Sequence, residues 1–146
     1  MYKTILVPLD GSELAASILD QVGMLAQGYG ARLILMTVGP TLPTSLSRAR
    51  DIQLTLTFQA EAYLERIRDA LVSRGLSVET TVRIGDPAGE ILEMATHQKI
   101  DLIMMTSRGG EGASSPFLGS VAAKVAGISK IPVLVFNATA NNGEKR

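Results

Sequence analysis

Four short, densely apolar runs constrain the fold of this chain more than any other feature of its sequence. Apolar side chains occupy successive positions in each run, so both faces of each segment avoid water. This pattern predicts strands that are covered on both sides, as strands are in a parallel sheet. The four predicted strands are Thr4–Leu9, Leu33–Val38, Leu102–Met105 and Val133–Phe136.

A fifth run, Ser77–Ile84, follows a different pattern. Val78 and Val82 fall on one face of an extended segment, whereas Glu79 and Arg83 fall on the other. The alternation predicts a half-exposed strand at an edge of the sheet.

Apolar residues recur at helical spacing between the predicted strands. These segments carry residues typical of helix ends, such as a hydroxyl or carboxylate cap, an early proline or a terminal glycine. One segment is ambiguous, because Ile52–Phe58 also fits a period of two, but the pattern from Ala60 onward favours a helix. Helices are predicted from Ser12 up to Gly28, from Arg50 to Arg74, from Asp86-Pro87 onward and over Leu118–Val125.

The predicted elements alternate between strand and helix along the whole chain. This order predicts an α/β domain with a five-stranded, parallel, doubly wound sheet and helices on both faces. Such sheets bind ligands at the carboxyl ends of their strands, where the strand order reverses. One domain is expected over residues 1–138, and the polar stretch 139–146 is expected to be a disordered tail.

Charge balance and the absence of cysteine exclude several classes of function. Basic and acidic residues number 14 each, so no net field draws the chain to nucleic acid or to an anionic membrane. Without cysteine there is no disulfide or thiolate nucleophile, and a single histidine, His97, rules out a His-rich metal site. No stretch reaches the roughly 20 apolar residues of a membrane span, and no signal-peptide core follows Met1. We therefore expect a cytoplasmic protein.

The loop after the fourth buried strand is rich in glycine and serine. In MMTSRGGEGASSPFLGSVAAKV, it leads from the strand to a helix that opens at Gly119-Ser120. Glycine lets backbone N–H groups approach phosphate oxygens, and the helix adds the positive end of its dipole. Arg108 offers a charge and Ser120 a hydroxyl. The spacing of the glycines matches neither a Walker A loop nor a G-x-G-x-x-G fingerprint. The alternative to phosphate binding is a long flexible loop whose glycines only permit turns.

The same loop resembles the phosphate loop in the nucleotide-binding branch of the universal stress protein family. That loop follows the pattern G-x2-G-x9-G-[ST] after the fourth strand. Gly109 aligns with its second glycine and Gly119-Ser120 with its end, while Thr106 replaces the first glycine. The resemblance continues through ILVPLDGS, GDPAGEIL, DLIMMTSRG and IPVLVF, and so covers almost the whole chain.

This resemblance implies a Rossmann-like sheet of strand order 3-2-1-4-5 that binds ATP, or AMP or ADP, with Mg or Mn held through the phosphates. It also implies a homodimer formed through the last strand, Ile131–Phe136. In the family, the acidic residue after the first strand holds the nucleoside, and the end of the second strand offers backbone atoms to adenine. The nucleotide-binding residues carried over are Pro8, Leu9, Asp10, Val38, Met105, Thr106, Ser107, Arg108, Gly109, Gly119, Ser120 and Val121.

Two of these residues raise alternatives. Asp10 also fits a turn residue in Asp-Gly-Ser, assisted by Ser12. Thr106 resists the positive φ that glycine adopts readily, so a loop that needs this conformation must be remodelled here. If the loop needs only an extended N–H group at this position, threonine supplies it.

Two other features have a structural interpretation. Gly85-Asp86-Pro87 is interpreted as a turn, a cap and a helix start, and His97 is interpreted as a surface residue at a helix end.

Three functions follow from these observations. The favoured one is a sensor or regulatory domain that binds ATP or AMP. The second is a slow ATPase or an autophosphorylating protein, although Asp10 is the carboxylate expected beside the loop and the loop holds no convincing general base. The third is a dimeric stress-response interaction protein that binds no nucleotide. The presence of Gly109, Gly119 and Ser120, which match the phosphate-loop pattern, argues against this third function. Any enzymatic activity is expected to be slow ATP hydrolysis at most.

Overall fold

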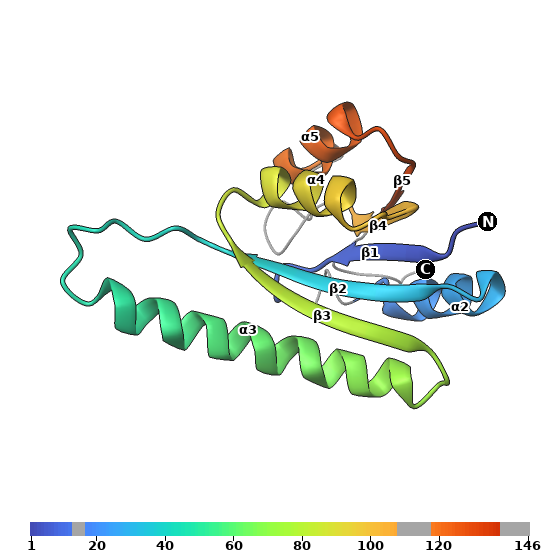
Figure 1. Ribbon diagram of the computed structural model, residues 1–146, viewed down its shortest axis with the longest axis horizontal. Helices are drawn as coiled ribbons and strands as arrows, with labels where there is room; N and C mark the ends of the chain where they lie inside the picture. Colours follow the sequence, from blue (N-terminus) through green and yellow to red (C-terminus); the bar gives the residue numbers. More distant parts are fainter. Residues whose placement is uncertain (13–16, 108–117, 138–146) are drawn as a thin grey trace, which may run out of the picture.

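The computed structural model describes residues 1–12, 17–107 and 118–137. Its central feature is a five-stranded parallel sheet with strand order β3-β2-β1-β4-β5 (Figure 1). This order confirms the predicted fold class and places the half-exposed strand at one edge and the last strand at the other. The strands are β1 (Thr4–Pro8), β2 (Arg32–Gly39), β3 (Ser77–Ile84), β4 (Leu102–Thr106) and β5 (Val133–Phe136).

The described helices cover both faces of the sheet. Helices α2 and α3 pack on one face, called here the α2/α3 face, and α4 and α5 pack on the other, the α4/α5 face (Figure 1). Each helix follows a strand and returns the chain to the opposite end of the sheet, as parallel pairing requires. The helices are α2 (Leu19–Tyr29), α3 (Ala49–Val72), α4 (Pro87–His97) and α5 (Ser120–Ile128).

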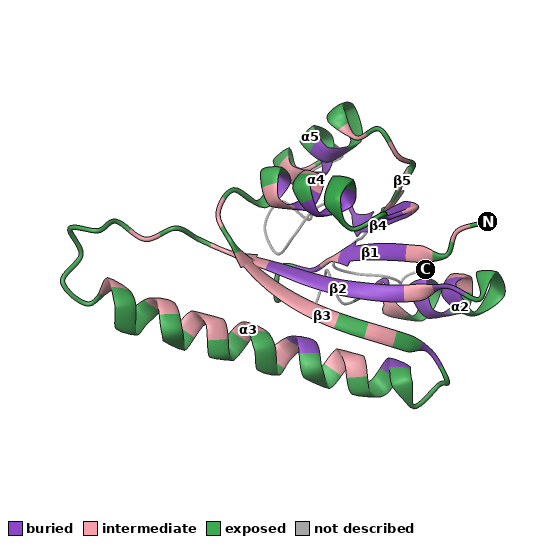
Figure 2. Ribbon diagram, viewed as in Figure 1, coloured by how far each residue is buried: buried purple, intermediate pink, exposed green. Residues whose placement is uncertain are grey.

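The core consists of one apolar cluster on each face of the sheet. Successive residues of a strand point to opposite faces, so Leu33 and Leu35 of β2 join the α2/α3 cluster, whereas Ile34 and Met36 join the α4/α5 cluster. Figure 2 shows β1 and β2 buried along most of their length. The continuous apolar runs in the sequence arise because these strands are covered on both sides.

The ambiguous stretch Ile52–Phe58 is helical and forms part of the first half of α3. Leu54 and Phe58 lie one turn apart and are 53% and 67% exposed, while Leu56 between them is half-buried. Farther along, Leu64 and Leu71 are buried against the sheet. The period of two arises because apolar residues occupy both the inner and the outer side of this part of the helix.

The first described helix, α2, begins later than predicted. Its first residue is Leu19, its N-cap position is Ile18, and Ser17 lies in a turn. Ser12, the predicted N-cap, donates through its hydroxyl to Asp10. Residues 13–16 lie outside the described part of the chain.

The turn before α4 has the structural role predicted for it. Gly85 adopts a φ of 146°, which a side chain would oppose. Asp86 caps the helix by accepting a hydrogen bond from the Gly89 N–H at 2.8 Å, and Pro87 is the first helical residue. These contacts fix the start of α4 at the carboxyl end of β3.

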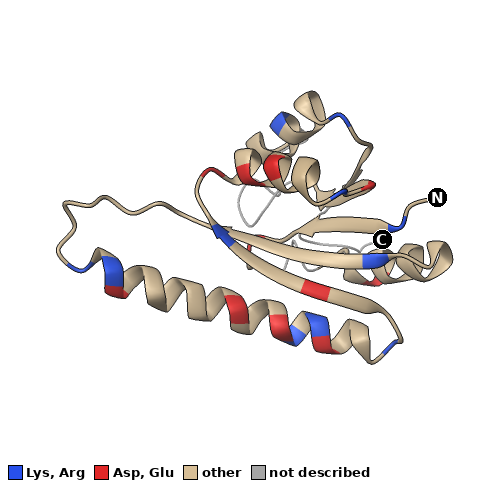
Figure 3. Ribbon diagram, in the orientation of Figure 1, with Lys and Arg blue, Asp and Glu red and all other residues tan. Residues whose placement is uncertain are grey.

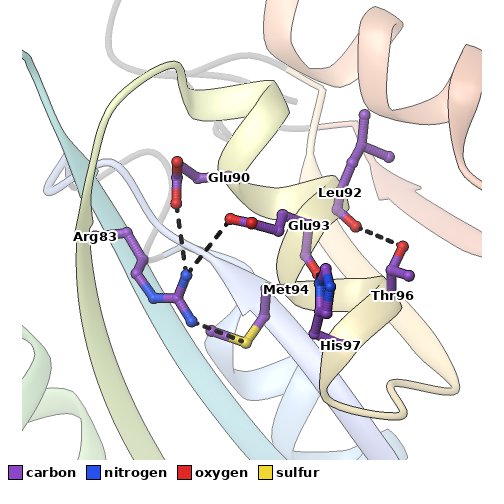
Figure 4. A network of polar contacts seen from close by, with 7 residues as sticks. All are labelled: Arg83, Glu90, Leu92, Glu93, Met94, Thr96 and His97. Atoms are coloured by element: carbon purple, nitrogen blue, oxygen red, sulfur yellow. Dashed lines mark hydrogen bonds and ion pairs between the residues drawn. The ribbon is translucent and has the colours of Figure 1, made fainter.

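Arg83 ties the end of β3 to α4 (Figure 4). Its Nη1 lies 3.5 Å from Glu90 Oε1 and 3.9 Å from Glu93 Oε1. Such partly exposed ion pairs contribute at most about 1 kcal/mol to stability, so the cluster is a weak surface contact between β3 and α4.

His97 ends α4, about 15 Å along the helix from its start at 1.5 Å per residue. This distance separates His97 from the carboxyl edge of the sheet.

Charged side chains are interspersed over the described surface. Figure 3 shows basic and acidic positions mixed along α3, in keeping with the balanced composition. Among the described helices, none combines the length and the apolar character that a membrane crossing requires.

Candidate nucleotide site

The strand order reverses between β1 and β4. From β1 the chain proceeds to β2 and β3 on one side, whereas β4 and β5 lie on the other. Because β1 and β4 pair directly, the segments that follow them begin side by side at the carboxyl edge of the sheet. This position is the switch point at which doubly wound sheets bind ligands.

A backbone hydrogen bond closes the base of the loop between β4 and α5. The Gly119 N–H donates to the Ser107 carbonyl oxygen at 2.7 Å. The bond holds the first turn of α5 against the end of β4, although these residues lie on either side of a long connection. Arg108 and Gly109 fall outside the described residues.

The start of α5 is suited to an anion. Gly119 occupies the N-cap position with φ −67° and ψ 165°, and it has no side chain with which to cap the helix. Its carbonyl oxygen accepts from Ala123, which leaves the earlier N–H groups of Ser120 and Val121 without a partner inside the helix. Ser120 is exposed and Val121 half-buried. A helix start of this kind favours a phosphate or carboxylate.

Asp10 lies in a tight turn directly after β1. Its Oδ1 accepts hydrogen bonds from the Ser12 N–H at 3.0 Å and from the Ser12 hydroxyl at 2.6 Å. Gly11, between them, has a φ of 86°, a conformation that favours glycine. The turn confirms the structural interpretation of Asp10, and it also holds an exposed carboxylate at the carboxyl edge of β1.

Tyr63 reaches this turn from α3. Its hydroxyl donates to the Ser12 carbonyl oxygen at 3.2 Å. Burial, and after it the negative charge of Asp10, raises the pKa of Tyr63 to about 12. The phenol is therefore protonated at neutral pH and is a hydrogen-bond donor.

Thr106 ends β4 and pairs with Phe136 of β5. Within the described residues, Lys99 is the only residue other than glycine with a positive φ, so the backbone of Thr106 is extended. The loss of glycine at this position therefore imposes no left-handed strain. Of the two alternatives raised by the sequence, the structure supports the extended one.

Two hydroxyl groups near the carboxyl edge are buried without a partner. Thr37 of β2 and Ser107 are 8% and 3% exposed, and in the part of the chain that the structure describes their hydroxyl oxygens form no hydrogen bond. Leaving such a group unpaired costs about 1–3 kcal/mol. Strand alternation directs Thr37 to the α2/α3 face, as it does Leu35.

The remaining predicted residues line the ends of the strands. The Leu9 N–H donates to the Met36 carbonyl oxygen at 2.7 Å, which keeps the end of β1 beside the end of β2. Leu9 and Met105 are buried, whereas Pro8 and Val38 are half-buried.

Two residues near the candidate site, Thr37 and Tyr63, were not predicted from the sequence. A threonine inside the apolar run LILMTV was an available signal for Thr37, but nothing distinguished Tyr63 from the other residues of its helix.

Comparisons with known proteins point to one protein family. The sequence model of the Universal stress protein family matches residues 1–137. Universal stress protein YxiE of Bacillus subtilis is 31% identical over an alignment that covers 92% of this chain and 99% of YxiE.

Solved structures with similar folds include several that are more than a quarter identical in sequence. Protein MJ0577 of Methanocaldococcus jannaschii superimposes with a TM-score of 0.86 at 30% identity, covering 98% of this chain and 99% of that chain. A universal stress protein in complex with cAMP superimposes with a TM-score of 0.70 at 27% identity, covering 94% of this chain and 98% of that chain.

Proposed function

Because the chain belongs to the universal stress protein family, we propose that it is a cytoplasmic sensor or regulatory domain that binds an adenine nucleotide, ATP or AMP. The observation that carries the proposal is the hydrogen bond between Gly119 and Ser107, which holds the start of α5 beside the end of β4 at the switch point. A related protein, 27% identical, was solved in complex with cAMP, a nucleotide of this class.

The residues at the carboxyl edge divide into three groups with different roles. The phosphates contact the N–H groups at the start of α5, together with Arg108 and Gly109 of the loop. Asp10 accepts hydrogen bonds from the ribose, and the backbone of Val38 contacts adenine. The apolar wall of the site consists of Pro8, Leu9 and Met105. Thr106 and Ser107 line the site at the end of β4, and Ser120 and Val121 supply the N–H groups at the start of α5.

The unpaired hydroxyls of Thr37 and Ser107 support a polar ligand at this edge. A buried hydroxyl without a partner is rare in a folded protein and calls for a partner that the described residues do not supply. A nucleotide brings donors and acceptors that satisfy such groups. The exposed carboxylate and the helix start fit the ribose and the phosphates, so the residues present fit this ligand.

Any metal ion in the site is expected to be held through the phosphates. Among the described residues, no group of three His, Asp or Glu side chains is placed to hold a metal. Magnesium commonly keeps several waters and binds through substrate phosphates. Mg or Mn would therefore accompany ATP, with water completing its coordination.

Calorimetric titration of the purified protein tests the binding proposal. We expect AMP, and ATP with magnesium, to give saturable heat with one site per chain, because the site offers a partner to each part of the nucleotide. GTP at the same concentrations is the control for the base, and it should bind more weakly. The absence of heat, combined with the absence of nucleotide in an acid extract of the protein, would contradict the proposal.

The proposed role is binding, with slow turnover at most. His97 lies at the far end of α4 from the site, and Asp10 is the carboxylate that the described residues bring to it. We expect phosphate release from ATP far slower than about 1 per second, the lower end of ordinary enzyme turnover. Release at that rate or faster, measured over hours with an enzyme-coupled phosphate assay, would favour the hydrolase.

We propose that the domain forms a homodimer through Ile131–Phe136. Strand β5 is an edge of the sheet and carries Leu134, which is 39% exposed. An apolar edge strand tends to pair with another strand.

Light scattering tests the dimer. We expect twice the chain mass for the wild type and the mass of one chain for Leu134→Lys, because lysine on an edge strand opposes pairing. Val72→Lys is the matched control, since Val72 is 48% exposed on α3 and lies away from this edge. A wild-type monomer at high micromolar concentration would refute the dimer.

A further inference from the structure

Tyr63 connects the middle of α3 to the turn that carries Asp10. We propose that Tyr63 is a positioning residue, which orients the Asp10 carboxylate and thereby sets the preference of the site for nucleotides with ribose hydroxyl groups. This inference rests on the proposed function, because it concerns how the same site recognises the sugar of its ligand.

Three hydrogen bonds link Tyr63 to Asp10 through a single residue. The Tyr63 hydroxyl donates to the Ser12 carbonyl oxygen at 3.2 Å. Ser12 in turn donates to Asp10 Oδ1 through its N–H at 3.0 Å and through its hydroxyl at 2.6 Å. A displacement of Ser12 therefore moves two of the donors that hold the carboxylate.

Tyr63 is itself held in place. Its ring packs on the buried cluster of the α2/α3 face, and the guanidinium carbon of Arg66 lies 5.9 Å from the ring centroid. Neighbouring Leu64 is fully buried, which fixes this turn of α3 against the sheet. The phenol therefore reaches the turn from a rigid element, whereas the turn contains a glycine with positive φ and lies after the end of β1.

The position of a carboxylate matters most to a ligand that donates hydrogen bonds to it. Bonds to an ionised acceptor are short, about 2.5–2.7 Å for a hydroxyl donor, and they weaken steeply when the geometry is lost. The 2′- and 3′-hydroxyls of ribose are such donors. In the proposed site, adenine contacts the backbone of Val38 and the phosphates accept hydrogen bonds from N–H groups, so neither depends on the Asp10 carboxylate. Loosening the turn should therefore weaken the recognition of ribose selectively.

Titration of Tyr63→Phe with AMP and with 2′,3′-dideoxy-AMP tests this role. The change removes one oxygen and leaves the ring packed in the core. The lost hydrogen bond between Tyr63 and Ser12 affects one interaction with the ligand, that of the Asp10 carboxylate with the ribose hydroxyls. We therefore expect AMP affinity to fall about fivefold, within the range of a single hydrogen bond. The affinity for dideoxy-AMP should change less than about twofold. An equal loss for both ligands, or no loss for either, would overturn the inference.

Two further variants separate positioning from general damage to the fold. In an Asp10→Asn background, Tyr63→Phe should have no additional effect on AMP affinity, because the carboxylate through which it acts is absent. Tyr29→Phe removes a phenol oxygen from the end of α2, at the opposite edge of the sheet, and should leave both affinities unchanged. An undiminished effect of Tyr63→Phe in the Asp10→Asn background would also refute the role.

Amide hydrogen exchange of the nucleotide-free protein distinguishes failure of the inference from failure of the proposed function. Tyr63→Phe should accelerate exchange of the Ser12 N–H, which is bonded to Asp10, and should leave the amides of β1 unaffected. Accelerated exchange in a protein that binds no nucleotide would refute the nucleotide site and retain the anchoring of the turn. Nucleotide binding with unchanged Ser12 exchange and unchanged sugar preference would retain the site and refute the role of Tyr63.

Discussion

Gly119→Asp is expected to abolish nucleotide binding and to leave the fold as stable as before, or slightly more stable. Both effects arise at the start of α5, where the new carboxylate stabilises the helix but repels a bound phosphate. Aspartate is a favoured N-cap residue and improves on glycine by a few tenths of a kcal/mol, and the φ and ψ of Gly119 suit it. Beside the phosphates, however, its charge repels the ligand. Like charges in contact cost several kcal/mol, so AMP affinity should fall by about 100-fold or more.

Two controls make this result specific to charge and to phosphate. Gly119→Asn has nearly the same shape and capping ability without the charge, and it should lose less than about tenfold in affinity. Adenosine lacks a phosphate, so its affinity should be similar in the aspartate variant and in the wild type. Calorimetry gives the affinities and thermal melting gives the stability. If Gly119→Asp binds AMP as the wild type does, the phosphates do not lie at the start of α5.

Leu64→Ala is expected to cost about 2–5 kcal/mol of unfolding free energy, the usual range for a buried leucine. The Leu64 side chain is fully buried between α3 and the sheet, so the change leaves a cavity in the α2/α3 cluster. Urea unfolding, analysed by linear extrapolation, measures the loss.

Leu54→Ala is the matched control, because it makes the same chemical change in the same helix. Leu54 is 53% exposed, and the stability should change by less than about 0.5 kcal/mol. Equal losses at the two positions would mean that α3 presents a different face to the sheet from the one described. This pair therefore tests the orientation of the helix whose first half fits two periods in the sequence.

Much of the fold could be predicted because covered strands leave a strong mark on a sequence. Runs such as Leu33–Val38 are apolar at successive positions only where both faces of a strand are buried. Ser77–Ile84 alternates because β3 is an edge strand with one side partly in water. These local patterns, together with the alternation of elements, were sufficient to predict the parallel sheet.

The candidate site could be proposed from the sequence only where its parts lie close together in the chain or match a known loop pattern. The glycines around Gly119 carried that information, but the contact of Tyr63 with Ser12 joins residues 51 positions apart. No local pattern shows which turn of a long helix passes a given loop. The buried hydroxyl of Thr37 was visible as a polar residue in an apolar run, but its lack of a partner depends on every neighbouring side chain.

The bond between Gly119 and Ser107 also has a consequence for the divergence of this domain. It joins the end of β4 to the start of α5 directly, so the two ends of the connection between them lie side by side. Where the two ends of a connection are held together, lengthening the connection costs little, about 0.6 kcal/mol for each doubling of its length. A change in the number of residues between Ser107 and Gly119 should therefore cost the domain little stability. Relatives of this domain can therefore differ in the length of that segment and keep the same sheet.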